Sequence, residues 1–178
     1  MDYSRFSFVI TGFPRSGTAW ISQLLSLKDN SICLHEPETM LTGKLNEILH
    51  TYETVGCASS FPSISQAKIN CEKAAIIRRP INDCATSFEC KLSERNIDLV
   101  PFFQQSLDYI KDCAILMDEL NEFQLSLPFN GLFNSRGAHL PAVIMLWEFC
   151  YGAASKSELL KIKEICKMNI QTQTLGGI

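Results

Sequence analysis

The sequence predicts an α/β fold in which helices cover both faces of a short parallel sheet. Three short apolar runs, at residues 6–11, 31–35 and 73–79, alternate with segments of helical periodicity. This alternation is typical of three-layer α/β/α domains, whose strands are parallel and buried on both faces. An apolar run at 142–149 adds a further predicted strand, with a helix as the alternative, so we expect about four strands. In such sheets ligands bind beyond the carboxyl ends of the strands.

Helical segments are predicted between and after these strands, at residues 17–27, from about 39 to 52, from 80 to about 94, from 101 to about 123 and from 155 to about 168. The last begins with Ser155 and Glu158, which have the spacing of a capping box. Residues 56–65 and 124–141 are rich in turn-forming residues and are expected to be loops. The tail at 171–178 shows no periodicity and is expected to fray.

Composition indicates an ordinary globular protein, and we expect residues 1–178 to form a single domain. Sixteen basic and nineteen acidic residues give a net charge of −3 without a basic tract, so nucleic acid is not an expected partner. No apolar run approaches the ~20 residues that a membrane span needs. The apolar stretch after Asp2 and Arg5 is too short for a signal peptide. These features predict a cytoplasmic protein without membrane contact.

The eight cysteines form no C-x-x-C pair and have no nearby histidine partner, so zinc-site spacing is absent. Cys33 lies in an apolar run, and Cys113 and Cys166 fall on apolar faces of predicted helices. Free cysteine in such places acts as a small apolar side chain. We therefore expect reduced, buried thiols; disulfides in a secreted protein are the alternative.

The first predicted strand runs into a glycine-bounded turn and then a helix, with the sequence T-G-F-P-R-S-G-T-A-W at residues 11–20. This order aims backbone N–H groups and the helix dipole at a phosphate-like anion. The spacing from Gly12 to Gly17 matches the ATP-binding motif G-x-x-x-x-G-K-[ST]. However, Thr18 stands in the place of the lysine, and Arg15 is the only cation in the loop.

The displaced cation makes this loop resemble the 5′-phosphosulfate-binding loop of sulfotransferases, which reads roughly P-[KR]-S-G-T-x-W. These enzymes use 3′-phosphoadenosine 5′-phosphosulfate (PAPS) and release 3′,5′-ADP. The matching residues are Pro14, Arg15, Ser16, Gly17, Thr18 and Trp20. The resemblance implies a compact P-loop domain of a bacterial- or phage-like sulfotransferase. It extends over residues 6–37 and 73–90 and is a matter of layout from residue 100 onward.

Other parts of the cofactor site follow from the same resemblance. Ala19 belongs to the loop that would hold the phosphosulfate, and Trp20 matches a tryptophan that stacks on adenine in cytosolic sulfotransferases. A core tryptophan is the alternative interpretation. Many family members also carry a C-terminal Arg-Lys-Gly segment, for which Arg136-Gly137 is the nearest substitute here.

The third strand leads into a second motif, R-R-P-I-N-D-C-A-T-S at residues 78–87. Sulfotransferases bind the 3′-phosphate of the cofactor with the pattern R-x-P-x-x-x-x-x-S. Arg78 and Pro80 match it, and the position eight residues after the arginine is Thr86, followed by Ser87. The resemblance therefore implies that Arg78 and either hydroxyl hold the 3′-phosphate. An arginine fork and a hydroxyl suit a dianionic phosphate.

Proton abstraction from an acceptor requires a base, and Glu36 is the candidate. Several Golgi and bacterial sulfotransferases use a glutamate near the second strand, and His35-Glu36 resembles that arrangement. Adjacent residues of a strand point oppositely, so His35 and Glu36 face the site together only if the chain turns there. His50 and His139 lie in no motif and are expected to have no catalytic role.

The resemblance implies transfer of a sulfuryl group from PAPS to a hydroxyl or amine, on a small molecule, glycan or peptide. Arg15 and the loop N–H groups would stabilise the charge that develops. No metal is expected, because the sequence shows no acidic cluster that would hold magnesium. Two alternatives remain: a P-loop nucleotide or metabolite kinase, and a non-catalytic nucleotide-binding protein of the same fold.

Overall fold

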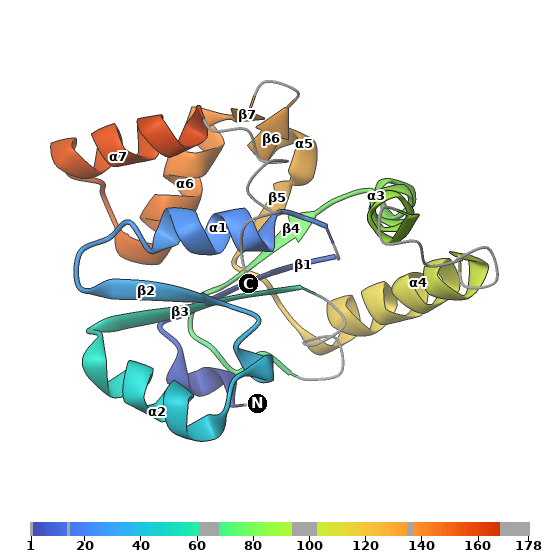
Figure 1. The fold of residues 1–178 in the computed structure, drawn as a ribbon, viewed down its shortest axis with the longest axis horizontal. Helices are drawn as coiled ribbons and strands as arrows, with labels where there is room; N and C mark the ends of the chain where they lie inside the picture. The colour runs from blue at the N-terminus through green and yellow to red at the C-terminus, as the bar shows by residue number, and fades with distance from the viewer. Residues whose placement is uncertain (1, 14, 61–67, 94–102, 135–136, 168–178) are drawn as a thin grey trace.

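The computed structural model describes residues 2–13, 15–60, 68–93, 103–134 and 137–167. A parallel sheet occupies the centre, with helices on both faces (Figure 1). Its strands are β1 (Phe8–Gly12), β2 (Ser31–His35), β3 (Thr54–Ser60), β4 (Ala74–Arg78) and β5 (Leu125–Pro128). The spatial order is β2-β3-β1-β4-β5, and every neighbouring pair is parallel. The predicted three-layer α/β/α fold is confirmed.

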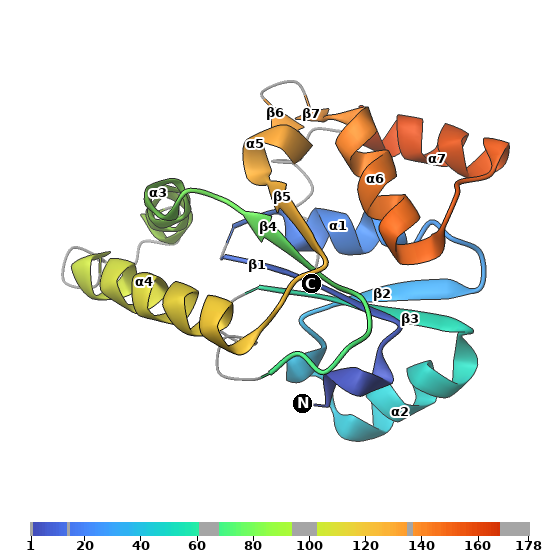
Figure 2. The same cartoon turned by 180° about the vertical axis from the view of Figure 1, so that it is seen from behind.

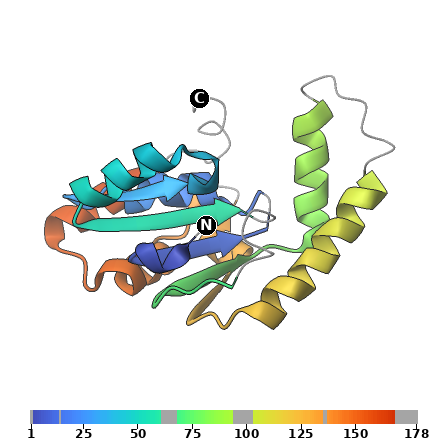
Figure 3. The same ribbon diagram turned by 90° about the horizontal axis from the view of Figure 1, so that it is seen from below.

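The helices lie on both sides of this sheet. They are η1 (Tyr3–Arg5), α1 (Thr18–Leu25), η2 (Pro37–Thr39), α2 (Thr42–Thr51), α3 (Ile81–Ser93), α4 (Phe103–Leu120), α5 (Phe129–Leu132), α6 (Leu140–Tyr151) and α7 (Lys156–Cys166). Viewed from behind, α6 and α7 stand with α1 on one side of the sheet and α2 on the other (Figure 2). In Figure 3, α3 and α4 form a pair that extends away from the sheet. A two-stranded antiparallel ribbon, β6 (Phe133–Asn134) and β7 (Gly137–Ala138), connects α5 to α6.

Two hydrophobic clusters fill the spaces between the layers, and strand residues alternate between them as a pleated sheet requires. Phe8 and Ile10 of β1 join Trp20 of α1 and Trp147 of α6 on one face. Val9, from the same strand, packs on the other face. We call these the α1 face and the α4 face.

Three sequence predictions about individual elements were wrong. The run at 142–149 is part of helix α6, in which the buried residues Val143, Leu146, Trp147 and Cys150 repeat at helical spacing. Pro141 fits the first turn of this helix, where no N–H is needed. Strand β3 takes up part of the predicted 56–65 loop, and β5 lies within the predicted 124–141 loop, so the described residues form a sheet of five strands.

The small residues of β3 explain why it does not look like a strand. A Cβ atom at Gly56 would overlap the Phe8 ring, so the aromatic side chain of β1 fills the space that a larger residue would need. Since β3 lies between β2 and β1, close packing rather than apolar bulk determines its sequence. Composition alone therefore gives the appearance of a loop.

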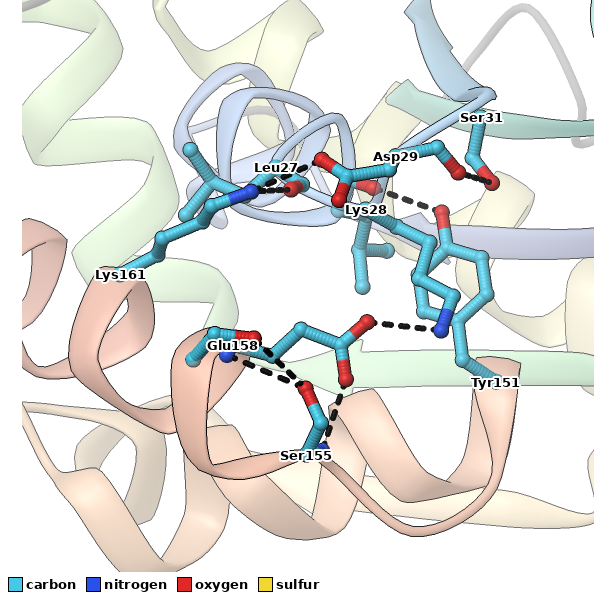
Figure 4. Close-up of polar contacts among 10 residues, drawn as sticks. Leu27, Lys28, Asp29, Ser31, Tyr151, Ser155, Glu158 and Lys161 are labelled. Atoms are coloured by element: carbon cyan, nitrogen blue, oxygen red, sulfur yellow. Dashed lines mark hydrogen bonds and ion pairs between the residues drawn. The ribbon is translucent and has the colours of Figure 1, made fainter.

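The last two helices are fixed to the end of α1 by a group of polar contacts (Figure 4). Lys28 Nζ donates to Glu158 Oε1 at 2.7 Å, and Tyr151 Oη donates to the Leu25 carbonyl at 2.6 Å. Glu158 also forms the capping box with Ser155 that the sequence predicted. The Lys28 hydrogen bond and the capping contacts lower the Glu158 pKa from 4.5 to about 2. These contacts attach α6 and α7 to the end of α1 and to the segment that leads from it to β2.

Seven cysteines are free in the described part of the chain, and six of them are buried. Burial raises the pKa of thiols such as Cys33 and Cys57, as expected for inert, packed side chains. Cys90 lies outside the residues whose side chains the structure describes, and the tail at 171–178 lies outside the described residues altogether. Within the described ranges, no helix combines the length and the apolarity that crossing a bilayer demands.

Candidate functional site

The glycine-bounded loop joins the central strand β1 to α1 through a left-handed backbone. Arg15 has φ 70° and Gly17 has φ 82°. A Cβ atom at Gly12 would lie 2.9 Å from the Ile77 carbonyl oxygen, so a side chain is excluded where the loop leaves the sheet. Helix α1 then begins at Thr18 without a side-chain cap. Its first N–H groups are therefore available to an anion.

The loop residues implied by the resemblance differ in exposure. Ser16, Thr18 and Trp20 are buried, whereas Arg15 and Ala19 are partly exposed. The Trp20 ring meets Phe133 edge-on, with 5.2 Å between centroids, so its contacts here are those of a core side chain. Two residues named for the cofactor site lie outside the described residues, namely Pro14 and Arg136.

The exit of β4 lies directly beside the loop because β4 pairs with β1. Arg79, which follows the strand, donates through Nη1 to the carbonyl oxygen of Arg15. From the following helix, the Ser87 hydroxyl accepts a hydrogen bond from Arg15 Nε at 3.3 Å. Thr86 is exposed. The structure thus brings Arg15, Arg79 and Ser87 together.

Arg78 points elsewhere. Its guanidinium makes two hydrogen bonds to the Asp118 carboxylate of α4, at 2.8 and 3.0 Å, and its Nε donates to Ser126 Oγ at 3.2 Å. Of the residues predicted to hold the 3′-phosphate, Arg78 thus contacts α4 and β5, Thr86 is exposed, and Ser87 contacts Arg15.

The end of β2 contributes a second polar group to the same edge. Glu36 has φ 49° and ψ 55°, a left-handed conformation that turns the chain after the strand. His35 Nε2 lies 3.3 Å from Thr18 Oγ1 and 3.8 Å from Glu36 Oε1. The Ser60 hydroxyl, at the end of β3, donates to the same carboxylate oxygen. His35 and Glu36 were expected to face the site together only if the chain turns after β2. The structure contains this turn.

Residues 35, 36 and 60 form a polar row that reaches the loop although β3 separates β2 from β1. Both the histidine and the carboxylate remain about one-third exposed, at 37% and 35% of their side-chain surface. A substrate group could therefore reach the carboxylate from solvent. This accessibility is a requirement for a general base.

The remaining histidines take no part in this arrangement. His50 and His139 are both exposed, in α2 and at the start of α6. Across the ranges that the structure describes, no group of three His, Cys, Asp or Glu side chains is arranged to hold a metal ion. The polar groups that the structure brings together at this edge include arginines, hydroxyls and one carboxylate–histidine pair.

Comparison with known proteins agrees with this architecture. No protein-family model and no curated sequence matches the chain. Among solved structures, it is similar to a sulfotransferase from Alicyclobacillus acidocaldarius, with a TM-score of 0.58 and 16% identity, over 85% of this chain and 82% of that one. The two proteins share a fold. At 16% identity the likeness concerns the fold.

Sequence reasoning missed three residues at this edge. Arg79 could have been found, because alternation along a strand places residues 78 and 79 on opposite faces. Ser60 could not, since the composition of the strand that carries it predicts a loop. Phe129, whose ring lies 4.4 Å from the Arg79 guanidinium, sits in a helix of only four residues that has no periodic signal.

Proposed function

We propose that this protein transfers the sulfuryl group of PAPS to a hydroxyl or amine acceptor. The observation that carries the proposal is the uncapped start of α1 beside Arg15, in a loop that lacks the lysine of ATP-binding loops. Backbone donors and one guanidinium suit a sulfated phosphate that needs no bound magnesium. The fold shared with a solved sulfotransferase supports the same reaction class.

The residues at the sheet edge fit the donor. The loop and first helical turn offer N–H groups for the phosphosulfate, and a half-buried arginine next to the loop offers charge for a second phosphate. The Nε atom of this arginine, Arg79, is buried and has no hydrogen-bond partner among the described residues. An unsatisfied buried donor of this kind is stabilised when an anion binds.

The chain would contribute charge stabilisation and proton transfer to the reaction. When bound, PAPS supplies an activated sulfuryl group with 3′,5′-ADP as its leaving group. Arg15 and the first-turn N–H groups stabilise negative charge on the loop side. Glu36, oriented by Ser60, accepts the proton of the acceptor, and His35 connects this carboxylate to Thr18. Phosphoryl transfer, whose transition state is loose, is the closest physical template.

The seven cysteines that are free among the described residues are consistent with a reducing compartment, so we place this reaction in the cytoplasm. The acceptor is a small molecule, a glycan or a peptide. The reaction involves neither nucleic acid nor a membrane.

The direct test incubates the protein with ³⁵S-labelled PAPS and a panel of alcohols, phenols, amines, glycans and peptides. We expect label to pass to at least one acceptor, and 3′,5′-ADP to form in equal amount. Thermal-shift measurements with 3′,5′-ADP and with ATP plus Mg²⁺ test the kinase alternative. Stabilisation by ATP–Mg²⁺ alone would contradict the proposal and favour a kinase, while stabilisation by 3′,5′-ADP without transfer would indicate a binding protein.

A further inference from the structure

We infer that Arg79 and Ser87, rather than Arg78 and Thr86, hold the 3′-phosphate of the nucleotide. This inference rests on the proposed function, because it assigns residues to a phosphate that only a 3′-phosphorylated nucleotide carries. It assigns Arg78 a structural role, in which it attaches α4 to the end of the sheet. Four observations support it.

The first observation is the direction of the two arginines. Residues 75 and 77 of β4 pack on the α1 face, while residues 74 and 76 pack on the α4 face. Arg78 continues the second set and contacts α4. Arg79, which follows the strand, contacts the loop between β1 and α1. Only Arg79 is therefore directed toward the place where the 5′-phosphosulfate would bind.

The second observation is that Arg78 already has an anionic partner. Asp118 accepts two hydrogen bonds from its guanidinium, a geometry that matches the arginine fork to a carboxylate. A phosphate dianion at Arg78 would lie beside this carboxylate, and like charges at such short range repel each other. Binding there would require the Asp118 contact to break.

The third observation concerns the charge on Arg79. The side chain is half-buried, and it contacts a carbonyl oxygen and the face of an aromatic ring, at Phe129. Across the described parts of the chain, no carboxylate lies within ion-pair distance of it. A partly buried guanidinium without a counter-ion is unfavourable, so a bound phosphate would compensate its charge. Its buried Nε atom offers a donor for that phosphate.

The fourth observation is the position of the hydroxyl. Ser87 follows Arg79 by eight residues, so the pair keeps the arginine-to-hydroxyl spacing of the family pattern, shifted by one position. Its Oγ lies 3.3 Å from Arg15 Nε, beside the loop. Thr86, which precedes it on the helix, is exposed to solvent. Arg79 and Ser87 thus meet the same loop residue from two sides.

The inference is tested by calorimetry with 3′,5′-ADP and 5′-ADP on the full chain and on the matched variants Arg79→Gln and Arg78→Gln. The readout is the ratio of the two affinities, which isolates the contribution of the 3′-phosphate. A charge-assisted contact to this group should give the wild type a preference of at least roughly tenfold for 3′,5′-ADP. We expect Arg79→Gln to lose most of this preference while binding 5′-ADP within a few-fold of the wild type. Arg78→Gln should keep the preference.

Each other outcome contradicts the assignment in a distinct way. If Arg78→Gln loses the preference and Arg79→Gln keeps it, the 3′-phosphate is held by Arg78. If Arg79→Gln weakens both nucleotides equally, Arg79 only supports the loop, through its contact with the Arg15 carbonyl. Ser87→Ala and Thr86→Ala distinguish the hydroxyls, and only Ser87→Ala should reduce the ratio. A wild type without any preference would instead refute the proposed function, and this assignment with it.

Discussion

Replacing Gly17 by alanine should destabilise the protein, because the backbone and the space around this residue both exclude a side chain. At φ 82° an alanine pays roughly 1–2 kcal/mol for the left-handed conformation. The new Cβ atom would also lie 2.7 Å from a ring carbon of Phe133. That ring is buried between Trp20 and Phe129, with centroid separations of 5.2 and 5.0 Å, so it has little freedom to move. Overpacking of this kind adds about 1–3 kcal/mol.

The expected loss is therefore about 2–5 kcal/mol in the free energy of unfolding, a large share of the roughly 5–15 kcal/mol that is typical of a domain. Urea denaturation followed by circular dichroism measures it. Gly43→Ala is the matched control: Gly43 lies in α2, a Cβ atom added there would meet no atom within 4 Å, and alanine favours the helix by up to about 1 kcal/mol. The double variant Gly17→Ala/Phe133→Leu should recover part of the loss. Equal stability of Gly17→Ala and the wild type would refute the claim that the backbone and the Phe133 ring exclude a side chain at Gly17.

Three further outcomes are expected. Arg15→Ala should lower turnover by on the order of a hundredfold or more, with a smaller effect on 3′,5′-ADP affinity, and Arg15→Lys should keep part of the activity; unchanged turnover would exclude a catalytic role. Glu36→Gln should leave nucleotide affinity unchanged and lower turnover roughly 10²–10⁴-fold, while His35→Ala should do less; the reverse result would exchange their roles. The pKa of Glu158 is depressed from 4.5 to about 2, so its ionised carboxylate stabilises the folded state. This contribution to the free energy of unfolding should be complete above about pH 4.5 and lost as the pH falls through about 2. The loss should be about 1–3 kcal/mol, less than the full shift implies because 34% of the Lys28 side chain is exposed, and acid titration of Glu158→Gln should show no such component.

The sequence was sufficient for the features that depend on local chemistry. The turn between β1 and α1 could be located because its glycines and the flanking periodicity are local signals, and the left-handed φ angles of Arg15 and Gly17 agree with it. The capping box at Ser155 was predictable for the same reason, since it needs only two residues at fixed spacing.

Features set by packing were not predictable from residue type. The small residues of β3 make sense only once Phe8 is known to lie over Gly56. Helix α6 is apolar around most of its circumference, which removes the periodic contrast that distinguishes a buried helix from a buried strand.

The arginine pair at the end of β4 shows that packing also determines which residues of the site can be predicted from the sequence. A motif matched by spacing selects Arg78, but the motif does not contain the position of Asp118, forty residues further along the chain. Only the fold shows that this carboxylate meets Arg78 while Arg79 contacts the loop. Which arginine serves a ligand thus depends on contacts between elements that are distant in sequence.

The measurement that tests the central claim most directly is calorimetric titration of the wild-type protein with 3′,5′-ADP and, separately, with 5′-ADP. A PAPS-dependent sulfotransferase must recognise the 3′-phosphate, so 3′,5′-ADP should bind at least roughly tenfold more tightly, as expected for one buried charge-assisted contact. The experiment needs no knowledge of the acceptor and no assay of transfer. Equal affinity for the two nucleotides would contradict the claim that this loop and the neighbouring arginine bind PAPS.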